Sequence, residues 1–157
     1  MSERIDIALT VNGEPVERRV PVRQNLVDFL RVDLGLTGSH VGCEHGVCGA
    51  CTVAVNGSSV RACLMLAVQA DGAIVTTVEG YSQSVPARAL QAAFEQHNAL
   101  QCGFCTPGML ASALEYIEAG GNGDRQAIRE HLSGNYCRCT GYQAIVDAVA
   151  SVAGGGP

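Results

Sequence analysis

Eight cysteines in a chain of 157 residues fall into two sets of four with different spacings. The first set has the spacing C-x4-C-x2-C with a later fourth cysteine, and it comprises Cys43, Cys48, Cys51 and Cys63. The second set pairs C-x2-C with C-x-C, and it comprises Cys102, Cys105, Cys137 and Cys139. Four thiolates suit one metal site, and no cysteine is left over. The cysteines therefore predict two metal centres.

The first set has the plant-type arrangement of a [2Fe-2S] cluster, with three ligands from one loop and one from a later segment. The loop over residues 39–51 carries Gly42, Gly46 and Gly49. Glycine can adopt positive φ, so this loop can turn its backbone amides toward the cysteine sulfurs. Such hydrogen bonds stabilise an anionic cluster and tune its potential.

The second set does not have the plant ferredoxin spacing, and taken alone it would also suit a four-cysteine zinc site. Two observations favour iron and sulfur. The first set already commits the chain to cluster chemistry, and the eight thiolates divide fully into two groups of four. We therefore expect a second [2Fe-2S] cluster, with zinc as the alternative.

Disulfides explain the cysteines less well. Eight cysteines in 157 residues lie below the roughly 8–10% that marks a disulfide-stapled secreted domain. The chain also opens without an apolar secretory segment. Zinc at both sites is disfavoured because C-x4-C-x2-C is an uncommon zinc spacing.

Composition limits the classes of partner. The net charge is −5 and Lys and Arg number only 10, so no basic stripe is present to meet nucleic-acid phosphates. Apolar stretches are interrupted well before membrane-spanning length. The first residues show neither a signal peptide nor a twin arginine, which predicts the cytoplasm. Charged residues make up 16% of the chain, fewer than a diffusing ferredoxin is expected to carry, so part of the surface should be buried against partners.

The N-terminal half has the alternation of a small mixed sheet crossed by a helix. Asn12-Gly13 and Asn56-Gly57 are turn dipeptides typical of β-hairpins, and the second hairpin would return Cys63 to the cysteine loop. Apolar residues at helical spacing predict a helix over residues 26–34 that Gly35 ends. The predicted strands cover residues 5–11, 16–22, 52–55, 59–63 and 73–78.

The C-terminal half has a 3.6-residue period and predicts four helices. The first carries Leu90, Ala93, Phe94 and His97 on one face. The remaining three helices are expected to start at caps, and these caps are Thr106, Asp124 and Thr140, the last in a capping box with Gln143. Because the connections are short, we expect a four-helix bundle.

The predicted fold class is therefore α+β, with an N-terminal β-grasp, plant-type ferredoxin-like domain followed by a C-terminal four-helix-bundle [2Fe-2S] domain. The expected boundaries are 1–79 for the ferredoxin-like domain, 80–85 for a linker, 86–153 for the helical domain and 154–157 for a tail.

Three segments of the sequence resemble the small iron–sulfur subunits of the molybdenum hydroxylase family, which includes xanthine dehydrogenases, aldehyde oxidoreductases and aerobic carbon monoxide dehydrogenases. The segments are GCEHGVCGACTV at 42–53, QCGFCTPGM at 101–109 and GNYCRCTGY at 134–142. The resemblance covers nearly the whole chain.

The resemblance implies an electron-transfer subunit with no substrate chemistry of its own. In this family a large subunit holds molybdopterin, here expected in a dinucleotide form, and a medium subunit usually holds FAD. The helical-domain cluster would lie nearest the pterin, and the ferredoxin-like cluster would pass electrons toward FAD. A dimer of heterotrimers is the expected assembly. No nucleophile, GxGxxG or P-loop motif indicates an independent enzyme.

By the same resemblance, Gln101 matches a family glutamine that hydrogen-bonds the pterin, and Cys139 is the candidate ligand near the pterin amino group. Arg138 either offsets cluster charge or contacts cofactor phosphate. His45 is expected to be a loop residue, because four cysteines already complete the first cluster.

Two other classes remain open. One is a free-standing two-cluster ferredoxin that shuttles electrons between separate enzymes. The other is a colourless, zinc-stapled interaction module.

Overall fold

Both predicted hairpins are present in the structure, a computed structural model that describes residues 3–154. Asn12 and Gly13 have φ values of 52° and 87°, and Asn56 and Gly57 have 51° and 82°. Positive φ at both central residues is what a two-residue type I′ turn requires. Each turn dipeptide therefore sets the register of its own hairpin, with Val11 opposite Glu14 and Val55 opposite Ser58.

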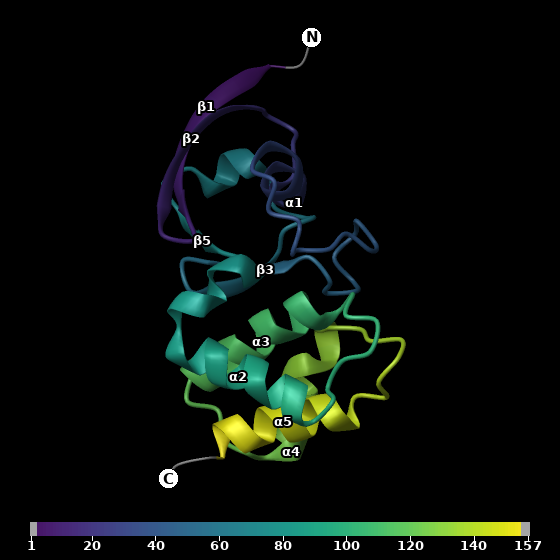
Figure 1. Ribbon diagram of the computed structural model, residues 1–157. Coiled ribbons are helices and arrows are strands. Elements are labelled where there is room, and N and C mark those ends of the chain that lie inside the picture. The colour runs from purple at the N-terminus through teal and green to yellow at the C-terminus, as the bar shows by residue number, and fades with distance from the viewer. Residues whose placement is uncertain (1–2, 155–157) are drawn as a thin grey trace.

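Five strands form one mixed sheet in the order β2-β1-β5-β3-β4. The strands are β1 (Arg4–Val11), β2 (Glu14–Pro21), β3 (Thr52–Val55), β4 (Ser58–Arg61) and β5 (Ile74–Thr76). Strands β1 and β5 are parallel, and the other neighbours are antiparallel. Figure 1 shows the long β1–β2 hairpin curving around the helix α1.

The helix predicted over residues 26–34 is present but is not regular. A single α-helical turn, α1 (Leu26–Asp28), is capped by the Asn25 side chain and continues as the π-helix η1 (Phe29–Asp33). Gly35 follows with φ 71°, so the predicted glycine stop is confirmed. The apolar face of α1 and η1 packs on the sheet together with the short 3-10 helix η2 (Ala67–Ala70).

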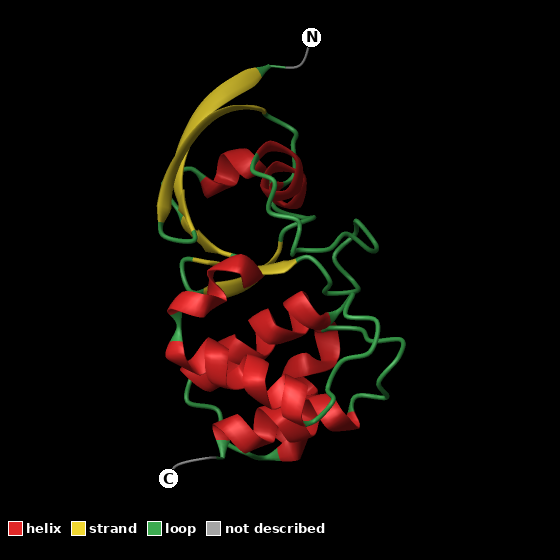
Figure 2. Cartoon of the chain, in the orientation of Figure 1, coloured by secondary structure: helices red, strands yellow, loops and turns green. Residues whose placement is uncertain are grey.

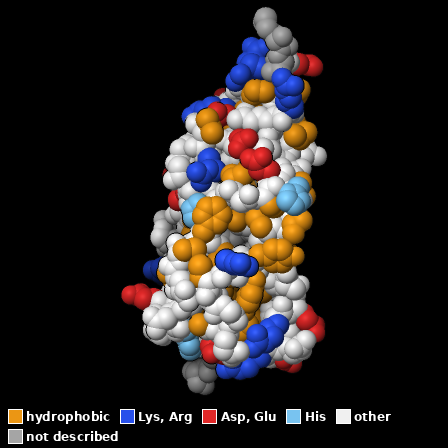
Figure 3. All heavy atoms as spheres, turned by 90° about the vertical axis from the view of Figure 1, so that its right-hand side faces the viewer, with side chains coloured by type: hydrophobic (Ala, Val, Ile, Leu, Met, Phe, Trp, Pro, Cys, Tyr) orange, Lys and Arg blue, Asp and Glu red, His pale blue; other side chains and the backbone are white. Residues whose placement is uncertain are grey.

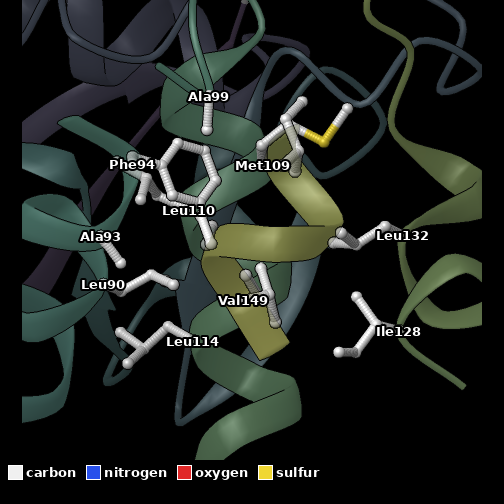
Figure 4. Close-up of a cluster of buried hydrophobic side chains, with 14 of the residues drawn as sticks. Leu90, Ala93, Phe94, Ala99, Met109, Leu110, Leu114, Ile128, Leu132 and Val149 are labelled. Atoms are coloured by element: carbon white, nitrogen blue, oxygen red, sulfur yellow. The ribbon is translucent and has the colours of Figure 1, made fainter. Parts of the chain in front are cut away.

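The C-terminal half is a bundle of four helices, as predicted (Figure 2). They are α2 (Val85–Gln96), α3 (Thr106–Glu118), α4 (Arg125–His131) and α5 (Gln143–Ala153), with a short 3-10 helix η4 (Leu132–Gly134) after α4. Figure 4 shows their core, in which Phe94 and Leu110 lie on one side of Val149, and Ile128 and Leu132 lie on the other. Asp124 caps α4 by accepting hydrogen bonds from the backbone of Gln126 and Ala127, as predicted.

Three predictions in this half were wrong. Thr106 is the first residue of α3 rather than its cap, which is Cys105, and Thr140 forms no capping box because α5 begins at Gln143. His97 is exposed at the end of α2, because the chain turns there and leaves the apolar face. Thr106 follows Cys105 in the chain, and the Thr140 hydroxyl donates to the Cys137 sulfur instead of capping a helix.

The two halves are joined by the 3-10 helix η3 (Val78–Gln83), whose Tyr81 is buried in the helical core. Helix α3 also packs directly against β3 and β4. Figure 1 shows the sheet half above the bundle, with the cysteine-bearing loops of both halves on the same side of the molecule. This packing brings the two sets of cysteines together.

Candidate metal centres

The first four cysteines are assembled by one loop and one hairpin. Glu44, Gly46 and Gly49 have positive φ in the loop, which wraps the backbone around Cys43. The amide of Cys48 donates to the Cys43 sulfur at 3.4 Å. Hairpin β3–β4 returns Cys63 beside Cys51, where the Ala62 amide donates to the Cys51 carbonyl at 3.3 Å. The loop therefore directs a backbone amide at a cysteine sulfur, as predicted.

The pKa values of two thiols in this set are shifted in opposite directions. Hydrogen bonds from the backbone amides of Cys48 and His45 lower the pKa of Cys43 to about 6. Burial raises the pKa of Cys51 to about 11. A cationic centre would be needed to hold Cys51 as a thiolate at neutral pH, and bound iron supplies that charge.

The second four cysteines converge from two segments of the helical half. Cys105 is the buried N-cap residue of α3, and Cys102 is exposed three residues before it. Cys102 lies with its sulfur 3.5 Å from that of Cys139, which is also exposed. Two segments distant in sequence therefore meet at their cysteines, as the second set predicted.

Hydrogen bonds from Thr140 distinguish Cys137 from the other thiols. The Thr140 hydroxyl and amide donate to the Cys137 sulfur at 3.1 Å and 3.4 Å. Although burial of Cys137 acts in the opposite direction, these hydrogen bonds lower the pKa of its thiol. Burial raises the pKa of Cys105 to about 12. Thr140, which was predicted to be a cap, is thus a hydrogen-bond donor to the Cys137 sulfur.

The backbone around Cys137 is held by Tyr142. Its hydroxyl accepts a hydrogen bond from the Cys137 amide at 2.9 Å, and its own φ is 69°. A bulky side chain with positive φ is uncommon and persists only where the surroundings enforce it. The sequence contained no signal for this role.

The close pairing of thiols at the second site suits a two-iron cluster. In a [2Fe-2S] cluster the four thiolates divide over two irons. Close pairs such as Cys102 with Cys139 and Cys105 with Cys137 match that division.

One further atom supports a group at the second site. The Thr106 hydroxyl oxygen is buried and has no hydrogen-bond partner among the described residues. Buried hydroxyls are normally satisfied, so a polar neighbour is expected there. Thr106 directly follows Cys105, and cluster sulfur would be a suitable acceptor.

The other predicted residues lie at the surface of the same region. Gln101 and Arg138 are exposed beside Cys102 and Cys139. The Nδ1 atom of His45 forms a hydrogen bond with the Cys43 carbonyl, so the ring is held within its own loop.

The two cysteine sites are directly connected. The amide of Tyr136 donates to the carbonyl of Cys48 at 2.9 Å, and Tyr136 precedes Cys137. His40 stacks on Phe104, with ring centroids 4.7 Å apart, and its Nδ1 contacts the Phe104 carbonyl at 2.8 Å. Cysteine spacing alone gave no indication of these contacts.

The face that carries both sites has exposed apolar side chains. Figure 3 shows apolar side chains gathered across the middle of this face around a Lys or Arg side chain, with more charged side chains above and below. Val47, Phe104 and Tyr136 belong to the cysteine loops and are 47%, 47% and 54% exposed. Exposed apolar patches of this kind mark interaction surfaces.

Comparison with known proteins agrees with this geometry. Residues 9–74 match a family model described as a 2Fe-2S iron-sulfur cluster binding domain, and residues 77–150 match one described as a [2Fe-2S] binding domain. The chain is therefore an iron–sulfur protein with two [2Fe-2S] domains.

Individual relatives show to which family of iron–sulfur proteins the chain belongs. The caffeine dehydrogenase subunit gamma of Pseudomonas sp. (strain CBB1) is 54% identical over 93% of this chain and 89% of the relative. The nicotine 6-hydroxylase small subunit of Paenarthrobacter nicotinovorans is 51% identical over 98% and 92%. The crystal structure of quinoline 2-oxidoreductase from Pseudomonas putida 86 contains a chain that matches with a TM-score of 0.91 and 49% identity over 97% and 95%. The protein belongs to the small iron–sulfur subunits of the molybdenum hydroxylases.

No helix among the described residues is long and apolar enough to cross a membrane.

Proposed function

We propose that this chain carries electrons from a molybdopterin site in a large partner subunit, through its two [2Fe-2S] clusters, to FAD in a medium subunit. The observation that carries the proposal is the direct hydrogen bond between the ligand-bearing segments of the two sites, from Tyr136 to Cys48. A [2Fe-2S] cluster supplies a one-electron carrier when it is bound. The chain would hold two such carriers in contact and catalyse no reaction on an organic substrate.

The proposed ligands are the eight cysteines. The first cluster would be held by Cys43, Cys48, Cys51 and Cys63, and the second by Cys102, Cys105, Cys137 and Cys139. Contacts between thiols support one iron held by Cys102 with Cys139 and the other by Cys105 with Cys137. The amides and hydroxyls that point at these sulfurs would favour the more negative, reduced state.

The second cluster is the better candidate for the pterin side. Its outer ligands Cys102 and Cys139 are exposed, whereas Cys43, Cys48 and Cys63 are half-buried and Cys51 is buried. Gln101 is exposed next to Cys102, where its amide could hydrogen-bond a pterin edge, and Cys139 is the proposed nearest thiolate. Arg138, exposed next to Cys139, would either offset cluster charge or contact cofactor phosphate.

The apolar face supports a permanent complex over a diffusing ferredoxin. A transient electron carrier needs a polar, soluble surface, whereas Phe104 and Tyr136 expose aromatic rings beside the outer thiols. Aromatic side chains are enriched in the centres of protein interfaces. We propose a cytoplasmic dimer of heterotrimers with the large subunit on this face.

Tagged protein purified from its native host tests the proposal. Two larger chains should be retained together with molybdenum, FAD and about four irons per copy of this chain, as two two-iron clusters require. Phe104→Asp and Tyr136→Asp should weaken retention of the larger chains, whereas Val32→Asp, at an exposed apolar position of the sheet half, should not. An iron-containing monomer without molybdenum would instead indicate the free ferredoxin, and zinc without iron would indicate the stapled module.

A further inference from the structure

A network of polar side chains holds the two cluster-bearing segments against each other. Asn135 is 2% exposed and its Nδ2 donates to the Gly49 carbonyl at 3.2 Å. Its Oδ1 accepts from the Ser112 hydroxyl at 2.9 Å and from Arg61 Nη2 at 3.3 Å. Arg61 comes from β4 and Ser112 from α3, so one buried amide connects both halves of the molecule.

Arg61 forms the second half of the network. Its Nη2 donates to the Gly134 carbonyl at 2.7 Å, and its Nη1 donates to the Thr52 hydroxyl. The Thr52 hydroxyl in turn donates to the Gly49 carbonyl at 2.6 Å. The guanidinium therefore fixes the segment before Cys137 and the segment after Cys51 at the same time.

Glycines allow the loop before Cys51 and the segment before Cys137 to approach each other closely. A Cβ on Gly49 would lie 2.7 Å from both the Asn135 side chain and the Gly134 carbonyl oxygen. A Cβ on Gly108 would lie 2.1 Å from the Gly49 carbonyl oxygen. Backbone therefore meets backbone at this junction, which allows the Tyr136 amide to reach the Cys48 carbonyl.

Electron transfer depends steeply on the separation of donor and acceptor and on the bonds that connect them. The route from Cys48 through its carbonyl, the Tyr136 amide and the backbone to Cys137 has a single non-covalent link. Covalent connection through η3 lies far along the chain from this junction. The length and persistence of that one hydrogen bond therefore depend on the contacts around it.

We propose that Asn135 and Arg61 are positioning residues for electron transfer between the two clusters. They hold the Cys48–Tyr136 hydrogen bond and thereby fix the separation of the clusters. Neither residue is a ligand, and neither contacts a cysteine sulfur by hydrogen bonding. This inference rests on the proposed binding of both clusters.

The test compares Arg61→Met and Asn135→Leu with Arg125→Met in the purified complex. Methionine keeps much of the arginine stem without its guanidinium group. Leucine keeps the branched shape of asparagine without its hydrogen-bonding groups. Arg125 pairs with Asp147 away from the junction and is the matched control. Iron content and the two separate EPR signals establish first that both clusters are present.

Two readouts then report on the junction. Rapid freeze-quench EPR after substoichiometric reduction measures the rate at which the electron equilibrates between the clusters. EPR of the fully reduced complex measures the magnetic interaction between them. We expect severalfold slower equilibration and a weaker interaction in Arg61→Met and Asn135→Leu, with both cluster potentials and the Arg125→Met protein unchanged.

Unchanged rate and interaction in Arg61→Met, with both clusters present, would overturn the proposal. A slower rate that follows a changed potential would also overturn it, because the driving force would then be the cause. If Asn135→Leu does not fold, the milder Arg61→Met variant decides. Absence of both clusters from the wild-type complex would instead refute the proposed function.

Discussion

The two cysteine sites hold the same number of thiols by different means. The first is a single loop in which glycines with positive φ direct amides at Cys43, and a hairpin returns Cys63. The second joins two segments of a helical bundle and depends on side-chain hydroxyls, with Thr140 on the Cys137 sulfur and Tyr142 on the Cys137 amide. The first site is thus local and based on backbone, and the second is assembled by tertiary packing.

The two sites also differ in the exposure of their thiols. Cys102 and Cys139 are exposed at the second site, whereas three thiols of the first are half-buried and Cys51 is buried. An exposed pair of ligands leaves one edge of the second site open to a partner. The two sites should therefore respond differently to the same kind of change.

Removing one buried ligand from each site should have the largest effect. Cys105→Ala should remove the EPR signal of the second cluster and about two irons per chain. Cys51→Ala should remove the EPR signal of the first cluster and a similar amount of iron. Electron flow through the complex should stop in both variants. Each variant is the control for the other, and iron analysis with EPR checks the result. A loss of both signals from either folded variant would show that the sites are not independent.

Core truncation should show that each site depends on its own half of the molecule. Phe94→Ala should lower the free energy of unfolding of the helical half by about 3–5 kcal/mol because it leaves a cavity in a packed core. Phe29→Ala is the matched change in the sheet half. Denaturant titration followed by the EPR of each cluster should show the second cluster lost first in Phe94→Ala and the first cluster lost first in Phe29→Ala. The same order of loss in both variants would contradict two separate cores.

The hydroxyl at Thr140 should tune the second site alone. Thr140→Val removes a donor at 3.1 Å from the Cys137 sulfur and should lower the potential of the second cluster. A loss of about 1 kcal/mol of preference for the reduced state corresponds to about 40 mV for one electron. Redox titration by EPR measures both clusters in one sample, so the first cluster is the internal control. Equal shifts of both clusters would refute a local effect.

The smallest effect is expected at the cap of α4. Asp124→Ala removes the acceptor for the Gln126 and Ala127 amides and should cost about 1 kcal/mol of stability. Asp6→Ala, an exposed change in the sheet half, is the control. Chemical denaturation measures the stability, and both cluster potentials should stay at wild-type values. A cost of several kcal/mol would mean that α4 supports the second site more directly than its contacts indicate.

The sequence predicted the features that depend on local structure better than those that depend on tertiary packing. Asn12-Gly13 and Asn56-Gly57 specify their turns through local φ preferences, and Asp124 caps a helix beside it. Thr106 and Thr140 satisfied the local rules for caps, but the residues at the cap positions are Cys105 for α3 and Tyr142 for α5. A local rule fails there because the site imposes its own geometry.

The junction between the halves had no sequence signal. Arg61 and Asn135 lie 74 positions apart, and neither belongs to a spacing that indicates a contact. The π-helix η1 was also not predicted, since its apolar spacing resembles that of an α-helix. Such features follow from packing rather than from any local pattern.

The central claim is that this one chain holds two [2Fe-2S] clusters in electronic contact. Low-temperature EPR of the native, dithionite-reduced complex tests it most directly, together with metal analysis of the same sample. We predict two distinct S = 1/2 signals that interact magnetically and about four irons per chain, as two two-iron clusters require. A single signal with about two irons, or zinc without any signal, would contradict the account.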